Sequence, residues 1–172
     1  MLIIFGGLPG TGKTTISKEL QKRGFRAISI DETENLCSWV HQETGKKSSK
    51  EVELNPEFVN EHDWICDVEL LKKLMDKGTD VVFVLGRAGN QDDFLHLFDK
   101  IILLQCSPET FCKRIEERTD NDFGKHLEIR KQILGRYKAY AEKMLAKDAI
   151  SIDTERPVDE VVRKILELTF LQ

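Results

Sequence analysis

The chain has 172 residues, a length that usually forms one domain and can bury a substantial hydrophobic core. Hydrophobic residues make up 40% of the sequence and charged residues 33%, as in globular proteins that dissolve in water. The net charge of -4 and the isoelectric point near 5.7 argue against a general nucleic-acid-binding surface. No apolar run approaches the roughly 20 residues that a membrane-spanning helix needs.

Cysteine spacing and the start of the chain bear on the cellular compartment. Cys37, Cys66, Cys106 and Cys112 form no C-x-x-C pair and have no metal-ligand spacing, so we expect reduced thiols. The first predicted strand begins at Leu2, which leaves no room for a signal peptide. We therefore expect a cytoplasmic protein without a membrane partner, either a monomer or a weak homodimer.

Five short apolar runs are the expected strands of a parallel sheet. They cover residues 2–5, 25–30, 80–85, 100–105 and 149–152. They alternate with helical patterns, which is typical of a sheet with helices on both faces. Successive apolar residues in these runs favour strands that are buried on both faces. The sequence therefore predicts an α/β fold with three layers.

Five helices are expected between and after these strands. The first covers residues 13–23 and the second residues 67–77, and each is followed by a glycine that suits the position after a helix. A third begins after Ser107, a capping residue followed by Pro108 in the first turn. A fourth covers residues 127–147, and the last begins at Pro157 with one apolar face.

Two stretches match neither a strand pattern nor a helix pattern. Residues 32–65 separate the second and third strands and are much longer than an ordinary crossover loop. Residues 119–125 are polar, contain a glycine and lie between two helices. Long irregular segments in compact domains are usually binding loops or lids. Within a single domain of residues 1–172, we predict a substrate-binding insert at residues 32–65 and a lid at residues 119–127.

The first strand leads into a phosphate-binding loop (P-loop). The consensus G-x-x-x-x-G-K-[ST] is met at every fixed position, with a strand before it and an amphipathic helix after it. The glycines let backbone N–H groups surround phosphate oxygens, and the helix directs its positive end at the anion. We expect Lys13 on the β- and γ-phosphates, Thr14 on Mg²⁺, and Thr15 on the helix face or at the α-phosphate. The residues expected to bind ATP here are Gly7, Pro9, Gly10, Thr11, Gly12, Lys13, Thr14 and Thr15.

The ends of the other strands distinguish classes of P-loop protein. Many ATPases and GTPases hold Mg²⁺ with an acidic residue at the end of a later strand. Here the third strand ends before Gly86 and the fourth ends in Gln105, so neither supplies an acidic residue, and these two classes are disfavoured. Asp31 instead follows the second strand, at the edge where ligands of open parallel sheets bind. It could accept the proton of an attacking hydroxyl, hold Mg²⁺ through water, or be a solvated turn residue.

Arginines around the predicted lid are candidates to neutralise a transferring phosphoryl group. Arg114 and Arg118 lie four residues apart on one predicted helix, so both can face the same site. Arg118 also lies at the hinge of the predicted lid, and Lys125 and Arg130 are further candidates. The alternative is a solvent-exposed helix face shared with two glutamates.

The phosphate loop, the carboxylate after the second strand and the arginine-bearing lid together resemble the small P-loop kinases, which include the adenylate, shikimate and gluconate kinase families. The resemblance extends over nearly the whole chain and is closest to bacterial adenylate kinase-like and AAA-family ATPase proteins, through residues 90–100, 118–126 and 152–157. It implies the sheet order 2-3-1-4-5, Mg-ATP as donor, and a loop at residues 153–157 that wraps the adenine. Arg156 would stack on the base, or Arg156 and Pro157 would simply begin the last helix.

One departure from that family concerns the acceptor. Adenylate kinases carry arginines after the second strand that clamp the acceptor's phosphate, whereas residues 32–65 here contain lysines but no arginine. A neutral, hydroxylated acceptor therefore fits better than a nucleoside monophosphate. Trp39 and Trp64 in the insert could sandwich a base or sugar, or close a small core of their own. His41 and His62 lack a third ligand for a metal site.

The loop after the third strand opens at the same edge of the sheet. Arg87 is a candidate contact for the γ-phosphate or the acceptor. Asn90 and Gln91 could read a base edge or sugar hydroxyls, or cap the helix that follows. Asp67 could point into the same cleft or cap the second helix.

We predict an ATP-dependent kinase that phosphorylates a hydroxyl of a small molecule such as a nucleoside, sugar or hydroxy acid. The expected catalytic residues are Lys13, Asp31, Arg87 and Arg118. The alternatives are a nucleoside monophosphate kinase, an ATP-binding regulatory protein with slow ATPase activity, and a polynucleotide 5′-hydroxyl kinase. The acidic isoelectric point and the lack of a basic groove sequence argue against the last of these.

Overall fold

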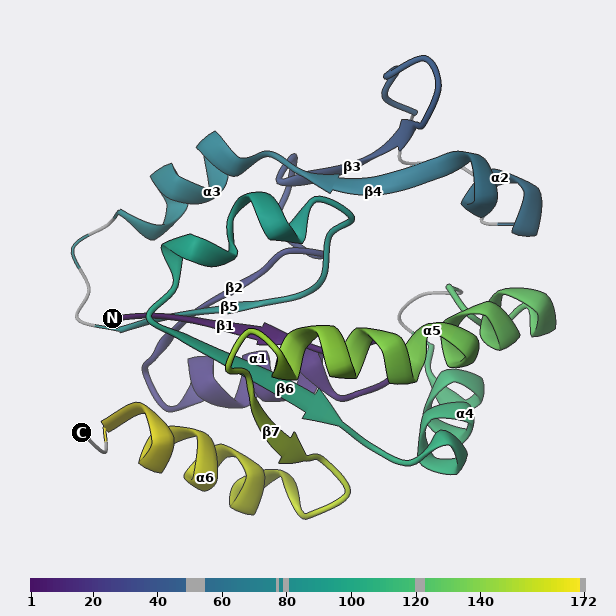
Figure 1. The fold of residues 1–172 in the computed structure, drawn as a ribbon. Helices are drawn as coiled ribbons and strands as arrows, with labels where there is room; N and C mark the ends of the chain where they lie inside the picture. Colours follow the sequence, from purple (N-terminus) through teal and green to yellow (C-terminus); the bar gives the residue numbers. More distant parts are fainter. Residues whose placement is uncertain (49–54, 77, 79–80, 120–122, 171–172) are drawn as a thin grey trace.

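A five-stranded parallel sheet forms the centre of the protein (Figure 1). The computed structural model describes residues 1–48, 55–76, 78, 81–119 and 123–170. The strands are β1 (Leu2–Gly6), β2 (Arg26–Ser29), β5 (Val82–Leu85), β6 (Lys100–Gln105) and β7 (Ile150–Asp153). Their order is β2-β5-β1-β6-β7, which is the predicted order 2-3-1-4-5 once the strands of the insert are numbered.

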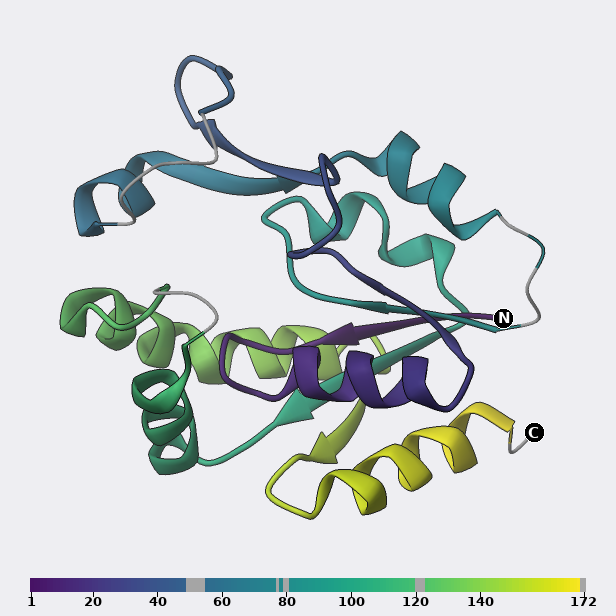
Figure 2. The ribbon, with the colours of Figure 1, turned by 180° about the vertical axis from the view of Figure 1, so that it is seen from behind.

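Helices cover both faces of this sheet because its central strands are apolar on both faces (Figure 2). On one face, α1 (Lys13–Lys22) and α6 (Val158–Phe170) pack against Ile3 and Phe5 of β1. On the other, α3 (Val68–Met75), α5 (Leu127–Leu145) and the 3₁₀ turn η2 (Leu95–Leu97), which follows the 3₁₀ turn η1 (Gln91–Asp93), pack around Ile4 and Val84. Each fully buried side chain of this size contributes about 1.5–3 kcal/mol. The predicted three-layer architecture is confirmed.

Local capping explains where the helices begin and end. The Asp67 carboxylate accepts the N–H of Leu70 at 2.9 Å, so this residue caps α3, one of its two predicted roles. Ser107 caps α4 (Pro108–Glu117) as predicted, by accepting the N–H of Thr110 at 3.2 Å. The predicted end of the second helix at residue 77 and the predicted start of the third strand at residue 80 lie outside the described residues. None of the helices in the described ranges is long and apolar enough to cross a membrane.

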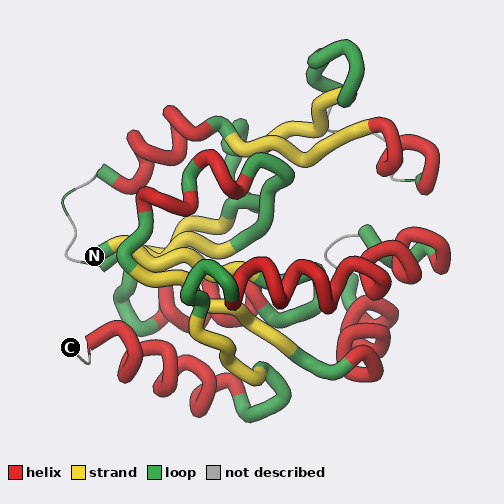
Figure 3. The backbone as a smooth tube through the Cα atoms, in the orientation of Figure 1, coloured by secondary structure: helices red, strands yellow, loops and turns green. Residues whose placement is uncertain are grey.

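The insert between β2 and β5 contains an antiparallel hairpin, which corrects our prediction of an irregular segment (Figure 3). β3 (Cys37–His41) pairs with β4 (His62–Cys66), and Trp39 lies opposite Trp64. The short helix α2 (Pro56–Glu61) precedes β4 directly. Both strands are rich in aromatic and β-branched residues, which favour strands, but their wide separation along the chain hides the pairing. Residues 49–54 of the insert lie outside the described part of the chain.

Asn90 fastens the base of this hairpin to the loop after β5. Its side-chain oxygen accepts the N–H of Cys66 at 2.9 Å, and its amide donates to the Cys66 carbonyl at 3.0 Å. The N–H of Gly89 also donates to the Trp64 carbonyl at 2.6 Å. The Asn90 side chain therefore holds β4 in place, a role different from the base reading or helix capping that we considered from the sequence.

Gly86 provides a test of how closely β2 and β5 approach. Its φ is +146°, and a Cβ there would lie 2.6 Å from the Cβ of Ile30. We expect Gly86→Ala to lower the free energy of unfolding by about 2 kcal/mol or more through strain and overpacking.

Gly135→Ala is the matched control, because a Cβ at this position in α5 meets nothing within 4 Å. It should raise the free energy of unfolding by about 1 kcal/mol. Urea unfolding measures both values, and equal effects would contradict this packing.

Candidate active site

The candidate site lies where the parallel strands end. The P-loop follows β1, Asp31 follows β2, Arg87 follows β5, and Thr154 follows β7. Because the carboxyl ends of parallel strands meet at one edge of a sheet, side chains far apart in the sequence gather there. The helix α4, which carries Arg114, follows β6 at the same edge.

The backbone of the P-loop has the conformation that glycine permits. Gly10 and Gly12 have φ of +81° and +88°, and a Cβ on Gly7 would lie 2.6 Å from Oγ1 of Thr11. The Thr11 hydroxyl donates to the Leu8 carbonyl at 2.8 Å, so this buried side chain shapes the loop and its hydroxyl is turned into the protein. A concave backbone of this kind suits the phosphate groups of a nucleotide.

Lys13 lies across the loop that precedes it. Its ammonium group donates to the carbonyls of Gly7 and Leu8, each at 2.9 Å. Burial lowers the pKa of Lys13 to about 8, the negative charge of Asp31 opposes this shift, and the positive charges of Arg87 and Arg118 add to it. The site thus gathers more positive than negative charge around Lys13, and an anion bound there would relieve the imbalance.

Asp31 follows β2, which β5 separates from β1, and its charge acts on Lys13. Its carboxylate oxygen Oδ1 accepts the indole N–H of Trp64 at 3.1 Å. Desolvation by the surrounding protein raises the pKa of Asp31, although part of the side chain reaches solvent, while Lys13, the Trp64 hydrogen bond and Arg118 lower it. The structure therefore places Asp31, Arg87 and Arg118 within electrostatic reach of Lys13 and adds Trp64 as a partner of Asp31.

The fourth predicted catalytic residue, Arg87, is exposed at the end of β5. Its guanidinium carbon lies 5.1 Å from the ring centroid of Tyr140, a cation–π contact. The Tyr140 hydroxyl donates to the side-chain oxygen of Gln91 at 3.2 Å. Within the described residues, the buried Gln91 nitrogen Nε2 has no hydrogen-bond partner. A buried donor of this kind is suited to an acceptor atom on a ligand.

Arg114 connects the P-loop to the loop after β7. It donates to the Gly10 carbonyl at 3.4 Å, to the Thr154 hydroxyl at 3.0 Å and to the Thr154 carbonyl at 2.7 Å. Glu155 accepts the N–H of Ser107 at 3.0 Å and its hydroxyl at 2.5 Å, and these bonds lower the pKa of Glu155 to about 2. The segment expected to wrap the adenine is therefore fixed against α4 and the P-loop.

Arg118 lies at the end of α4, where the predicted lid begins. Its guanidinium donates to the carbonyl of Phe123, and its charge acts on both Lys13 and Asp31. Arg130 of α5 donates to the carbonyls of Gly124 and Lys125, each at 3.2 Å. Arg130 therefore holds the segment that we predicted to be a lid, and Arg118 contacts the same segment through Phe123. Residues 120–122 of the predicted lid lie outside the described residues.

The remaining predicted nucleotide contacts lie around the P-loop and β7. Pro9 and Thr14 are half-buried, and Thr15 is exposed on α1. Arg156 is exposed and lines a shallow groove between β7 and α6. The Pro157 carbonyl accepts the N–H groups of Glu160 and Val161 at 2.9 and 3.1 Å, so Pro157 directly precedes α6 and closes its first turn, while the contact of Arg156 and Pro157 with the base stays a prediction.

The cysteines and histidines of the insert form contacts within the hairpin. All four cysteines are free thiols, and Cys37 lies opposite Cys66 with a hydrogen bond between their side chains. The rings of His41 and His62 lie 4.9 Å apart, and His62 bonds the Phe58 carbonyl at 2.9 Å. Across the described ranges, no three acidic, histidine or cysteine side chains form a metal-binding group.

Three features of the site escaped the sequence interpretation. The bond between Trp64 and Asp31, the contact of Tyr140 with Arg87, and the binding of Arg114 to Thr154 join residues far apart in the chain. No local pattern marks such pairs. The paired tryptophans of the insert were the available signal for the first of them.

Comparisons with known proteins agree with this geometry. A family model described as an AAA domain matches residues 3–135, and the chain belongs to this family. A protein of Methanocaldococcus jannaschii described as "Putative adenylate kinase" is 30% identical over 168 residues, covering 96% of this chain and 86% of its own length.

Solved structures share the fold at low sequence identity. A deoxyadenosine kinase from M. mycoides has a TM-score of 0.57 and 18% identity, with coverage of 98% of this chain and 99% of its own. A sugar kinase from Janibacter sp. HTCC2649 has a TM-score of 0.58 and 15% identity, covering 99% and 95% of the two chains. The protein therefore has the fold of the P-loop kinases.

The burial of Lys13 and the charges around it predict a specific dependence of stability on pH. The pKa of Lys13 is lowered from 10.5 to about 8, so between these values the unfolded state binds more protons and folding becomes more favourable as pH rises. The substitution Lys13→Met removes this effect. The free energy of unfolding of the variant, relative to that of wild type, should therefore fall by about 2 kcal/mol between pH 8 and pH 10.5.

Urea unfolding at several pH values measures this difference. Lys18→Met, an exposed position on the same helix, is the matched control and should show no such trend. A pH-independent difference between wild type and Lys13→Met would contradict the buried, positively charged environment of Lys13. Only the Lys13 variant should also lose ATP binding, measured by calorimetry.

Proposed function

We propose that this protein transfers the γ-phosphoryl group of Mg-ATP to the hydroxyl group of a small molecule. The observation that carries this proposal is the position of Asp31, a carboxylate held by Trp64 at the ligand edge of the sheet and electrostatically coupled to Lys13. A carboxylate beside a phosphate loop can accept the proton of an attacking hydroxyl. The kinase names of the M. jannaschii relative and the two structural neighbours support the same reaction class.

The P-loop supplies the donor half of the site. Its backbone N–H groups and Lys13 bind the phosphates, while Arg114 and Thr154 border the nucleoside side of the loop. Thr14 and Asp31 offer oxygen atoms, the ligands that Mg²⁺ prefers, directly or through water. When bound, Mg²⁺ neutralises charge on the β- and γ-phosphates.

Asp31 and the surrounding cations supply the acceptor half. Asp31 takes the proton of the acceptor hydroxyl, whose oxygen forms a bond to the γ-phosphorus as the bond to the bridging oxygen of ADP breaks. Lys13, Arg118 and Arg87 neutralise the charge on the transferring group. The lid that Arg118 contacts through Phe123 would exclude water, which otherwise competes with the acceptor.

Nucleoside monophosphate kinase activity is the second candidate. The name of the M. jannaschii relative favours it. The loop after β5 also favours it, because Arg87 offers a positive charge and Gln91 a buried donor without a described partner, and both could bind a nucleotide acceptor. The absence of arginine from residues 32–65 weighs against it, because arginine is the usual ligand for a second phosphate. An ATP-binding regulatory protein would instead show slow ADP release that no acceptor stimulates.

Asp31→Asn tests the proposed role of the carboxylate. This variant should bind ATP as wild type does but lose at least about a hundredfold in kcat, because general bases contribute roughly 10²–10⁴-fold. Acceptor-dependent ADP release, screened over nucleosides, nucleotides, sugars and hydroxy acids, measures the rate. Glu34→Gln removes an exposed carboxylate of the same segment and should leave the rate unchanged. Full transfer activity in Asp31→Asn would refute the assignment of the base.

A further inference from the structure

Four aromatic side chains form a cluster beside Asp31, and they bear on the class of acceptor. We propose that this cluster, made of Trp39, Phe58, Trp64 and Phe123, binds a flat ring of the acceptor, so that the acceptor is a ring-bearing alcohol of the nucleoside type. This inference rests on the proposed function, because it names the acceptor class for the same site.

Trp39 is the centre of the cluster. Its ring centroid lies 5.7 Å from that of Phe58, 5.4 Å from that of Trp64 and 6.1 Å from that of Phe123. These residues come from β3, α2, β4 and the lid segment, so the insert and the lid meet at this point. Both ribbon views place α2 on the same side of the molecule as the start of α5 (Figures 1 and 2).

Part of the cluster lies outside the hydrophobic cores of the protein. Among the described residues, Trp39 and Phe58 belong to none of the three core clusters, whereas Trp64 and Phe123 each pack against the edge of one. All four aromatic residues are only half-buried. Half-exposed rings beside a candidate catalytic carboxylate resemble the apolar walls of small-molecule sites. Flat rings pack on such side chains in stacked or edge-to-face arrangements.

Trp64 joins the cluster to the proposed chemistry. Its ring contacts Trp39 on one side, and its indole N–H bonds the Asp31 carboxylate at 3.1 Å on the other. A ring packed on Trp39 is therefore one side chain away from the base, within reach of a hydroxyl on the same compound. The carbonyl of Phe123 also accepts a bond from Arg118, so the lid residue at the cluster contacts the cation proposed to stabilise transfer.

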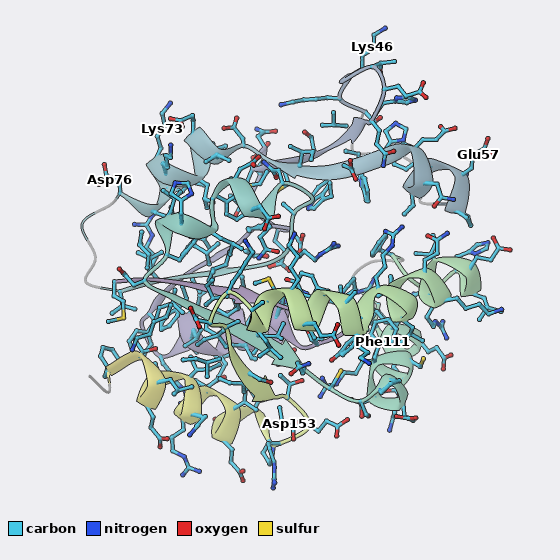
Figure 4. All side chains as sticks on the ribbon, viewed as in Figure 1. Lys46, Glu57, Lys73, Asp76, Phe111 and Asp153 are labelled. Carbon is cyan, nitrogen blue, oxygen red and sulfur yellow. The ribbon has the colours of Figure 1, made fainter. Side chains whose placement is uncertain are left out.

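Charge in the insert favours a neutral ring compound over a nucleotide. Residues 32–65 contain no arginine, and the described lysines Lys46 and Lys47 lie in the turn beyond β3. Lys46 points away from the body of the protein at the tip of the insert (Figure 4). The aromatic cluster therefore has no insert arginine beside it to bind a phosphate on the acceptor.

Tryptophan fluorescence tests ring binding directly, because Trp39 and Trp64 are the two tryptophans of the chain. Adenosine, guanosine, cytidine and thymidine are titrated in the presence of Mg-ADP, with correction for their absorbance. We expect saturable quenching by at least one of them and none by ribose. Quenching by no nucleoside would overturn the proposal.

Kinetics of the substitution Trp39→Ala provide the second test. With the nucleoside that stimulates ADP release most, KM should rise by about ten- to a hundredfold, the cost of losing one stacking partner, while KM for ATP stays unchanged. Trp39→Phe keeps a ring and should restore most of the affinity. Phe170→Ala truncates an aromatic residue that is 57% exposed on α6 and serves as the matched control. Circular dichroism and thermal unfolding check that each variant is folded.

The outcomes separate this inference from the proposed function. If ribose, gluconate or shikimate stimulates ADP release and Trp39→Ala leaves that reaction unchanged, the ring site is refuted and the kinase proposal stands. If nucleosides quench the fluorescence but no hydroxylated compound stimulates ADP release, ring binding stands and the kinase proposal fails.

Discussion

The surplus of positive charge around Lys13 is the constraint on which the rest of the site depends. Lys13, Arg87 and Arg118 come from three separate segments, and Asp31 is the carboxylate that acts most strongly on Lys13. Burial of the Lys13 ammonium group is the main cause of its lowered pKa, and the nearby positive charges of Arg87 and Arg118 lower that pKa further, against the opposing charge of Asp31. A fold that keeps such a cluster is suited to a polyanion, and the P-loop supplies the backbone to hold one.

The layered architecture followed from the sequence because its determinants are local. The apolar runs, the glycines after helices and the capping residues Asp67 and Ser107 each act within a few residues, and the strand order came from the family resemblance. The hairpin of the insert was missed because its two strands are far apart in the chain and meet through tertiary pairing. The role of Asn90 was missed for the same reason, because its partner Cys66 lies on a different element.

Part of the candidate site could also be predicted from the sequence, and part could not. The P-loop, Asp31 and Arg118 were identified from motif, strand end and hinge position, and the structure brings Lys13, Asp31 and Arg118 within electrostatic reach of one another. Trp64 and Tyr140 could not be assigned from the sequence, because what defines them is a contact with Asp31 or Arg87 across the fold. These contacts connect the insert and α5 to charged residues at the ends of β2 and β5, beside the phosphate loop.

Phosphorus NMR of a reaction containing the protein, Mg-ATP and a set of hydroxylated compounds tests the central claim most directly. A kinase of the proposed kind produces ADP and a new phosphomonoester signal in equal amounts, and only when the right acceptor is present. The account predicts this result, with little inorganic phosphate, because the lid and the acceptor exclude water from the γ-phosphate. ADP formed together with inorganic phosphate at a rate that no acceptor changes would contradict it.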